Sequence, residues 1–182
     1  MGAGGSLLTD EQMKKLKQTT PYNEQEIKRL LKRYATYDNS PGGTAGIKQE
    51  EILLFPEFAG NPLIPRVLDL YLNSESGRIF PDKFLYFCAI LSSRTGIGAK
   101  RQMAFRCFDV HNEGCLQYDE LFKMYKSLFG MALPDDTILN LVFTALHESN
   151  LETPGMITPE DFTRMVPDHE IAMRFTVDLQ LP

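Results

Sequence analysis

The chain has 182 residues, a hydrophobic content of 43% and a formal net charge of -5 at pH 7. These values are typical of a soluble globular protein and exclude a disordered chain. They also exclude a nucleic-acid-binding protein, because no run of Lys or Arg is present to neutralise phosphates. The three cysteines, Cys88, Cys107 and Cys115, include no CxxC pair, which favours reduced thiols in a cytoplasmic protein.

Residues 1–22 form an N-terminal segment that starts with MGAGGS. This start matches the pattern for N-myristoylation at Gly2, with Ser6 at the required position, and a small unstructured start is the alternative. One myristoyl chain binds a membrane with an association constant on the order of 10⁴ M⁻¹, so a second attachment would be needed. We find no signal peptide or membrane-spanning run, and expect a cytoplasmic protein that can join a membrane surface or a large assembly.

A capping box predicts the start of the first long amphipathic helix, because Asn23 and Glu26 can each accept a hydrogen bond from the other's backbone amide. The apolar stripe that follows has helical spacing and consists of Ile27, Leu30, Leu31 and Tyr34. Similar stripes occur later, at 103–108, 121–129 and 138–146. Taken alone, each stripe is more typical of a hydrophobic core than of a binding surface.

Glycine-containing loops alternate with these stripes, and each loop carries an aliphatic residue shortly after its glycine. These residues are Ile47, Ile79, Leu116 and Ile157, separated by 32, 37 and 41 residues. Such intervals suit the EF-hand, a helix-loop-helix unit with a twelve-residue cation-binding loop. Four units imply two pairs, in which the aliphatic residues at the eighth loop position form a short β contact.

The first two loops lack the ligands that calcium requires. The segment Asp38–Glu51 has fourteen residues, and counting back from Ile47 places Ser40 first, which offers only a hydroxyl. The second loop begins with Leu72 and ends with Lys83, whose ammonium would repel the ion at the twelfth position. We expect neither loop to bind calcium.

The third loop, DVHNEGCLQYDE, has the most complete set of ligands. A hard cation takes oxygens from positions 1, 3, 5, 7, 9 and 12, and a glycine at position 6 allows the sharp turn. The candidate metal ligands are Asp109, His111, Glu113, Cys115 through its carbonyl, Gln117 and Glu120, around Gly114. Because the imidazole at position 3 suits softer metals, we expect calcium binding here to be weak or absent. Zinc held by His111 and Cys115 is a further alternative.

The fourth loop, Asn150–Asp161, is intermediate. It offers Asn150, Glu152 and Asp161, but Pro154 occupies position 5 and contributes no side-chain ligand. An aspartate at position 12 is one methylene shorter than glutamate, which favours magnesium or no ion.

Glycines and prolines divide the chain, at 60–65 between the first two units and at 96–98 between the halves. The sequence therefore predicts an all-α protein of four EF-hand units in two paired lobes, with short β contacts between paired loops. The expected divisions are the N-terminal segment 1–22, the first pair 23–95, the second pair 96–170 and a C-terminal tail 171–182.

With these units placed, nearly the whole chain resembles the calcineurin B, calcineurin B homologous and calcium- and integrin-binding proteins. The resemblance is carried by MGAGGSLLTDEQ, by TPYNEQEIKRLLKRY, by FPEFAGNPLIPRV and by KRQMAFRCFDVHNEGCLQYDELFKMYKSLFG, with PDHEIAMRFTVDL near the end. The Pro-Glu-x-x-x-Asn-Pro element is specific to this group and is absent from calmodulin-like chains.

The resemblance implies a non-catalytic regulatory subunit that binds an apolar or amphipathic helix of a larger protein. That partner would be a phosphatase catalytic subunit, an exchanger, a channel or another assembly. The 12 Phe and 8 Met residues suit a groove for such a helix, although they could equally fill a core. The family's ligand positions carry over only to Asp109, Glu113, Gln117 and Glu120.

Two hypotheses for the function follow. In the first, the chain is a largely calcium-independent regulatory or scaffolding subunit. In the second, it is a calcium-responsive regulator that uses the third loop. An enzyme is not expected, because His147 and His169 lie near acidic residues without a nucleophile elbow, phosphate loop or metal triad.

Overall fold

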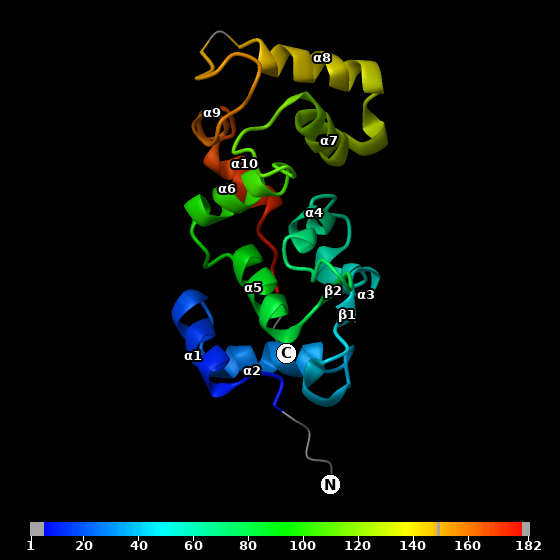
Figure 1. Ribbon diagram of the computed structural model, residues 1–182, viewed down its shortest axis with the longest axis vertical. Coiled ribbons are helices and arrows are strands. Elements are labelled where there is room, and N and C mark those ends of the chain that lie inside the picture. The colour runs from blue at the N-terminus through cyan, green and yellow to red at the C-terminus, as the bar shows by residue number, and fades with distance from the viewer. Residues whose placement is uncertain (1–5, 149, 180–182) are drawn as a thin grey trace. The chain divides into compact units, whose positions relative to one another are not determined.

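A computed structural model describes residues 6–148 and 150–179 of the chain. Within them it has these α-helices, drawn in Figure 1: α1 (Asp10–Thr19), α2 (Glu24–Tyr34), α3 (Gln49–Leu53), α4 (Ile64–Asp69), α5 (Pro81–Leu91), α6 (Ile97–Arg106), α7 (Tyr118–Phe129), α8 (Asp135–Leu146), α9 (Pro159–Met165) and α10 (Asp168–Arg174). The remaining elements are the 3₁₀ segments η1 (Pro41–Gly43), η2 (Pro56–Phe58) and η3 (Gly130–Ala132), and the strands β1 (Ile47–Lys48) and β2 (Arg78–Ile79).

This arrangement confirms the fold class expected from the sequence. The loops lie between α2 and α3, α4 and α5, α6 and α7, and α8 and α9. By internal contacts the described residues form two compact units, one within 1–60, 67–96 and 176–182 and the other within 61–66 and 97–175. Each unit therefore contains one pair of loops.

In the first unit the two loops are joined by the antiparallel pairing of β1 with β2, which places Ile47 opposite Ile79. Both side chains are fully buried. Helices α1 and α2 pack against α5, as Figure 1 shows. Their shared core is rich in aromatic rings, and Phe55 lies within 6.3 Å of the Phe84 ring, centroid to centroid. The aliphatic residues at the eighth loop position thus have a structural role that does not depend on an ion.

The extra residues of the first loop form the turn η1, which closes tightly on α5. Gly43 has a φ of +66°, and a Cβ built there would lie 2.6 Å from Cγ of Pro81. Because only glycine tolerates both this backbone and this approach, the insertion is accommodated by Gly43.

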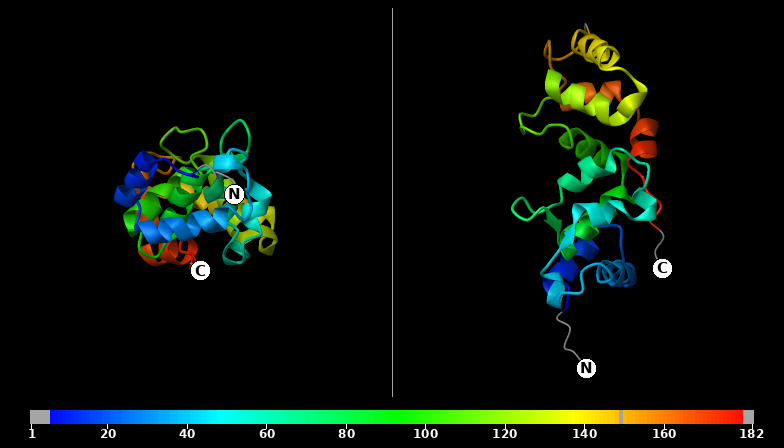
Figure 2. Two further views of the ribbon diagram at one scale, coloured as in Figure 1. Left: turned by 90° about the horizontal axis from the view of Figure 1, so that it is seen from below. Right: turned by 90° about the vertical axis from the view of Figure 1, so that its right-hand side faces the viewer.

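In the second unit the loops meet through a single antiparallel bridge between Leu116 and Ile157. The amide of Leu116 donates to the carbonyl of Ile157 over 2.8 Å, and the reverse bond is 3.0 Å long. Helices α7 and α8 pack along each other, as the right-hand view of Figure 2 shows. The second pair is therefore joined by the same kind of contact as the first.

Helix α10 completes the second unit by packing on α6. The buried ammonium of Lys100 donates to the carbonyl of Phe175, the C-terminal cap of α10. The side-chain amide of Asn61 donates to the neighbouring carbonyl of Arg174 over 2.8 Å. After α10 the chain adds to the first unit, where the amide of Val177 donates to the carbonyl of Leu91.

Cys88 and Cys107 are buried among apolar side chains, as expected for core residues. No helix in the described part of the chain is long and apolar enough to cross a membrane.

Candidate functional site

The third loop turns at Gly114, and the carboxylate of Asp109 holds that turn. One oxygen of Asp109 accepts a hydrogen bond from the amide of Glu113 over 2.9 Å, and the other accepts from the amide of Gly114 over 3.0 Å. Gly114 has a φ of +73°, a conformation that glycine adopts without strain. Asp109 is only 9% exposed, so its charge is directed into the loop.

Glu120, at the twelfth position, closes the same loop from its other end. Its side chain is 2% exposed. One carboxylate oxygen accepts a hydrogen bond from the amide of Val110 over 3.0 Å, and the other accepts from the amide of Gln117 over 3.1 Å. Glu120 thus links the second residue of the loop to its end, in addition to capping α7.

The other four predicted ligands lie farther out. Glu113, His111 and Gln117 are exposed, and Cys115 is half-buried. The side-chain amide of Gln117 donates to the carboxylate of Glu113 over 2.6 Å. Among the described residues, no three His, Cys, Asp or Glu side chains are grouped so that they could hold a metal ion.

The donor set of the third loop is nevertheless the one that a hard cation prefers, since all of its ligands apart from His111 would be oxygens. The carboxylates of Asp109 and Glu120 already point into the loop. Glu113 and Gln117 are exposed and hydrogen-bonded to each other. The residues fit calcium in their chemistry and only partly in their arrangement.

In the first loop a buried aspartate plays the part that Asp109 plays in the third. Asp38, which is 4% exposed, accepts hydrogen bonds from the amide and hydroxyl of Ser40, the amide of Gly46 and the hydroxyl of Tyr34. Burial acts to raise the pKa of Asp38, but these hydrogen bonds outweigh it and hold the pKa below its ordinary value. Asp38 lies two residues before Ser40, the first residue obtained by counting back from Ile47, because η1 lengthens the loop.

The second loop is stabilised by an asparagine one residue after its predicted start. The side-chain oxygen of Asn73 accepts hydrogen bonds from the amides of Glu75 and Ser76 over 3.1 and 2.9 Å. Lys83, at the predicted twelfth position, is exposed. Neither residue offers a carboxylate to an ion.

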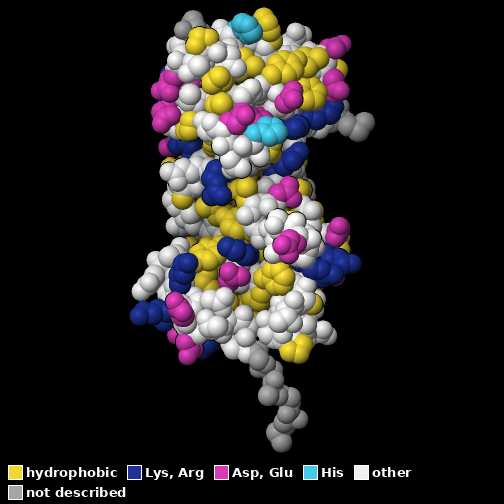
Figure 3. Space-filling model, in the orientation of Figure 1, with side chains coloured by type: hydrophobic (Ala, Val, Ile, Leu, Met, Phe, Trp, Pro, Cys, Tyr) yellow, Lys and Arg dark blue, Asp and Glu magenta, His cyan; other side chains and the backbone are white. Residues whose placement is uncertain are grey.

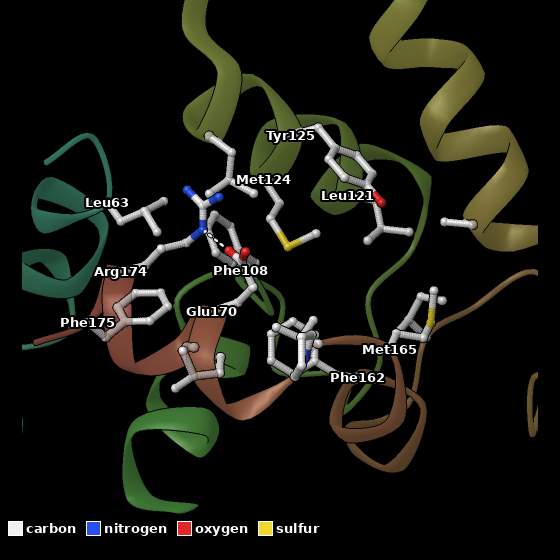
Figure 4. A pocket seen from close by; sticks show the side chains of 17 residues that line it. Leu63, Phe108, Leu121, Met124, Tyr125, Phe162, Met165, Glu170, Arg174 and Phe175 are labelled. Atoms are coloured by element: carbon white, nitrogen blue, oxygen red, sulfur yellow. Dashed lines mark hydrogen bonds and ion pairs between the residues drawn. The ribbon is translucent and has the colours of Figure 1, made fainter. Parts of the chain in front are cut away.

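A separate feature of the second unit is an apolar pocket of about 250 Å³. Helices α7, α9 and α10 supply most of its walls, and Figure 4 shows side chains of these helices directed into it. The main hydrophobic residues at its wall are Leu63, Phe108, Leu121, Met124, Tyr125, Leu128, Phe162, Met165, Ile171 and Phe175.

The pocket has a polar edge, where the guanidinium of Arg174 donates to the carboxylate of Glu170 over 2.8 Å. Met165 is 38% exposed, so the pocket wall reaches the surface there. Figure 3 shows further hydrophobic side chains at the surface over α7 and α8. The apolar stripe at 121–129 thus supplies both core and pocket, a distinction that helical spacing alone does not make.

Helix-loop-helix units joined in pairs through their eighth loop residues define an EF-hand protein. Over nearly its whole length this chain is similar to calcineurin B proteins. It is 27% identical to the calcineurin B protein of Naegleria gruberi over 179 residues, covering 98% of this chain and 100% of that one. It is 28% identical to the type 1 calcineurin B protein of Dictyostelium discoideum over 170 residues, covering 93% of each chain. No family model matches the chain. These similarities support a calcineurin B-like EF-hand protein.

Proposed function

We propose that the protein is a non-catalytic regulatory or scaffolding subunit that binds an apolar or amphipathic helix from the catalytic subunit of a phosphatase. The apolar pocket in the second unit carries this proposal, because an apolar helix face needs a preformed hydrophobic surface of this kind. The similarity to calcineurin B proteins supports a phosphatase as the partner.

The binding is largely independent of calcium in this proposal. The first loop has an altered length, and the second has a lysine in place of the carboxylate at the twelfth position. The carboxylates at the twelfth position of the third and fourth loops are bonded to backbone amides. The alternative is a calcium-responsive subunit, supported by the oxygen-rich ligand set of the third loop.

The N-terminal pattern supports a further part of the proposal, in which a myristoyl group on Gly2 lets the subunit reach a membrane surface from the cytoplasm. Gly2 lies outside the described residues.

Calorimetric titration with a synthetic helix from a calcineurin-type catalytic subunit tests the function. We expect binding in EDTA, and a loss of about tenfold in affinity for Met165→Asp, which places a charge in the pocket wall. Met173→Asp is the matched control, because Met173 is 64% exposed on α10 and does not line the pocket. Equal affinity for both variants would contradict the pocket as the binding surface, and binding only with calcium would favour the alternative.

A further inference from the structure

A positively charged side chain that follows the fourth loop joins the two ends of that loop. One guanidinium nitrogen of Arg164, in α9, donates to the backbone carbonyl of Asn150 over 2.7 Å. The same nitrogen forms an ion pair with the carboxylate of Asp161. Asn150 is the first residue of this loop and Asp161 is the twelfth.

Asp161 is fully buried, and a buried carboxylate is stabilised by a cationic partner. Its carboxylate accepts hydrogen bonds from the amide and the hydroxyl of Thr158, over 3.2 and 3.0 Å, and from the amide of Glu152. Those donors are neutral, and Arg164 is the positively charged group in contact with it. The residue three positions after Asp161 thus supplies the counter-ion for this buried carboxylate.

A divalent cation would connect the same parts of an EF-hand loop, since it binds oxygens from the first and twelfth positions together. From this geometry we infer that Arg164 acts as the permanent cation of the fourth loop and keeps the loop closed without a metal ion. Arginine suits this role because its planar guanidinium binds two acceptors in a fixed geometry.

No cationic side chain among the described residues joins the two ends of the third loop in this way. The residue three positions after Glu120 is Lys123, which is exposed, and its ammonium forms no hydrogen bond or ion pair with another residue that the structure describes. The carboxylate of Glu120 is held by backbone amides instead. The two loops of this pair therefore differ in the groups that bind the carboxylate at the twelfth position.

Closure of the fourth loop bears on its partner, because Ile157 lies in it and bridges to Leu116 in the third loop. With Arg164 in place, the bridge persists whether or not the third loop holds an ion. The closure of the loop by Arg164 does not require a partner protein. Its consequence for binding rests on the proposed function: the subunit would bind its partner helix constitutively.

Amide hydrogen exchange measured by NMR in EDTA tests the inference. In the unmodified protein we expect the amides of Leu116 and Ile157 to stay protected, and in Arg164→Gln we expect exchange at least about tenfold faster. Arg106→Gln is the matched control, since Arg106 is exposed on α6 and makes no side-chain hydrogen bond or ion pair with the described residues. It should exchange like the unmodified protein.

Protection that is absent in EDTA and restored by calcium would overturn the inference, as would unchanged exchange in Arg164→Gln. If Arg164→Gln does not fold, Arg164→Lys decides, because lysine keeps the positive charge. Exchange close to that of the unmodified protein supports a cation that holds the loop closed, and exchange at least about tenfold faster overturns it. No partner helix is present in this experiment, so its failure is distinguishable from failure of the proposed function.

Discussion

Arg33 and Glu57 form a two-point ion pair that ties α2 to η2. One of the two nitrogen–oxygen distances is 2.8 Å, and the side chains are only 18% and 9% exposed. The guanidinium also lies over the ring of Phe55, 4.4 Å from its centroid. Glu57 is the glutamate of the Pro-Glu-x-x-x-Asn-Pro element, which therefore has a structural role in the first unit.

Replacing Glu57 by Gln should lower the free energy of unfolding by about 2 to 4 kcal/mol, because Arg33 would keep a buried charge without its partner. Urea denaturation at neutral pH measures the change. Glu24→Gln is the control: Glu24 pairs with Lys17 and Lys28 on the surface, and little change is expected. If adding Arg33→Met to Glu57→Gln recovers no stability, the loss does not come from the unpaired charge.

Glu120 should contribute to stability even without an ion. Glu120→Gln in EDTA should cost about 1 to 2 kcal/mol, since the buried carboxylate accepts bonds from two backbone amides and a glutamine presents an acceptor to only one. Thermal unfolding followed by circular dichroism measures it.

Glu113→Gln is the control for Glu120, because Glu113 is exposed in the same loop. Its effect should stay within about 0.5 kcal/mol. Equal effects of the two variants in EDTA would show that the buried position of Glu120 does not stabilise the loop by itself.

Local patterns were sufficient to predict the units and their pairing. Leu116 and Ile157 could be matched from the sequence because each follows a turn glycine at fixed spacing and must be buried. The roles of Asp38 and Arg164 could not be predicted in this way. An insertion changes the count that places Asp38, and the contact of Arg164 with a backbone carbonyl depends on how α9 folds against its own loop. The pocket required the packing of helices that are distant in sequence.

The acid stability of the protein should depend on Asp38. Because its pKa in the folded state lies below the ordinary value of about 3.9, the ionised form is favoured by folding, and the stabilisation is fully present above that value. It is lost as the pH falls through the lower, folded-state pKa.

Urea denaturation between pH 2 and 6 measures this effect. Asp38→Asn should be less stable than the unmodified protein at pH 6, and the difference should shrink below pH 4. Asp119→Asn, at an exposed position, is the control and should give a curve like that of the unmodified protein. A constant difference between Asp38→Asn and the unmodified protein would mean that the charge of Asp38 is not what stabilises the first loop.

The alkaline behaviour should depend on Lys100. Burial lowers the pKa of this lysine to about 8, while its ammonium donates to the carbonyl of Phe175. The unfolded chain, with a lysine pKa of about 10.4, then binds more protons than the folded one between these values, so the free energy of unfolding should rise with pH. The neutral amine can still donate to Phe175, so the contact itself survives deprotonation.

The rise should amount to at most about 3 kcal/mol and should be absent in Lys100→Met. Chemical denaturation from pH 7 to 10 measures it as the difference between the two proteins. Burial raises the pKa of the Cys88 thiol, so that group lowers stability as the pH rises. Cys88 has this effect in both proteins, so its contribution cancels in the difference between their free energies of unfolding.

Lys123→Met, at an exposed site, is the control and should follow the unmodified protein. Parallel curves for Lys100→Met and the unmodified protein would mean that Lys100 keeps its charge in the folded state across this range, stabilised by the end of α10.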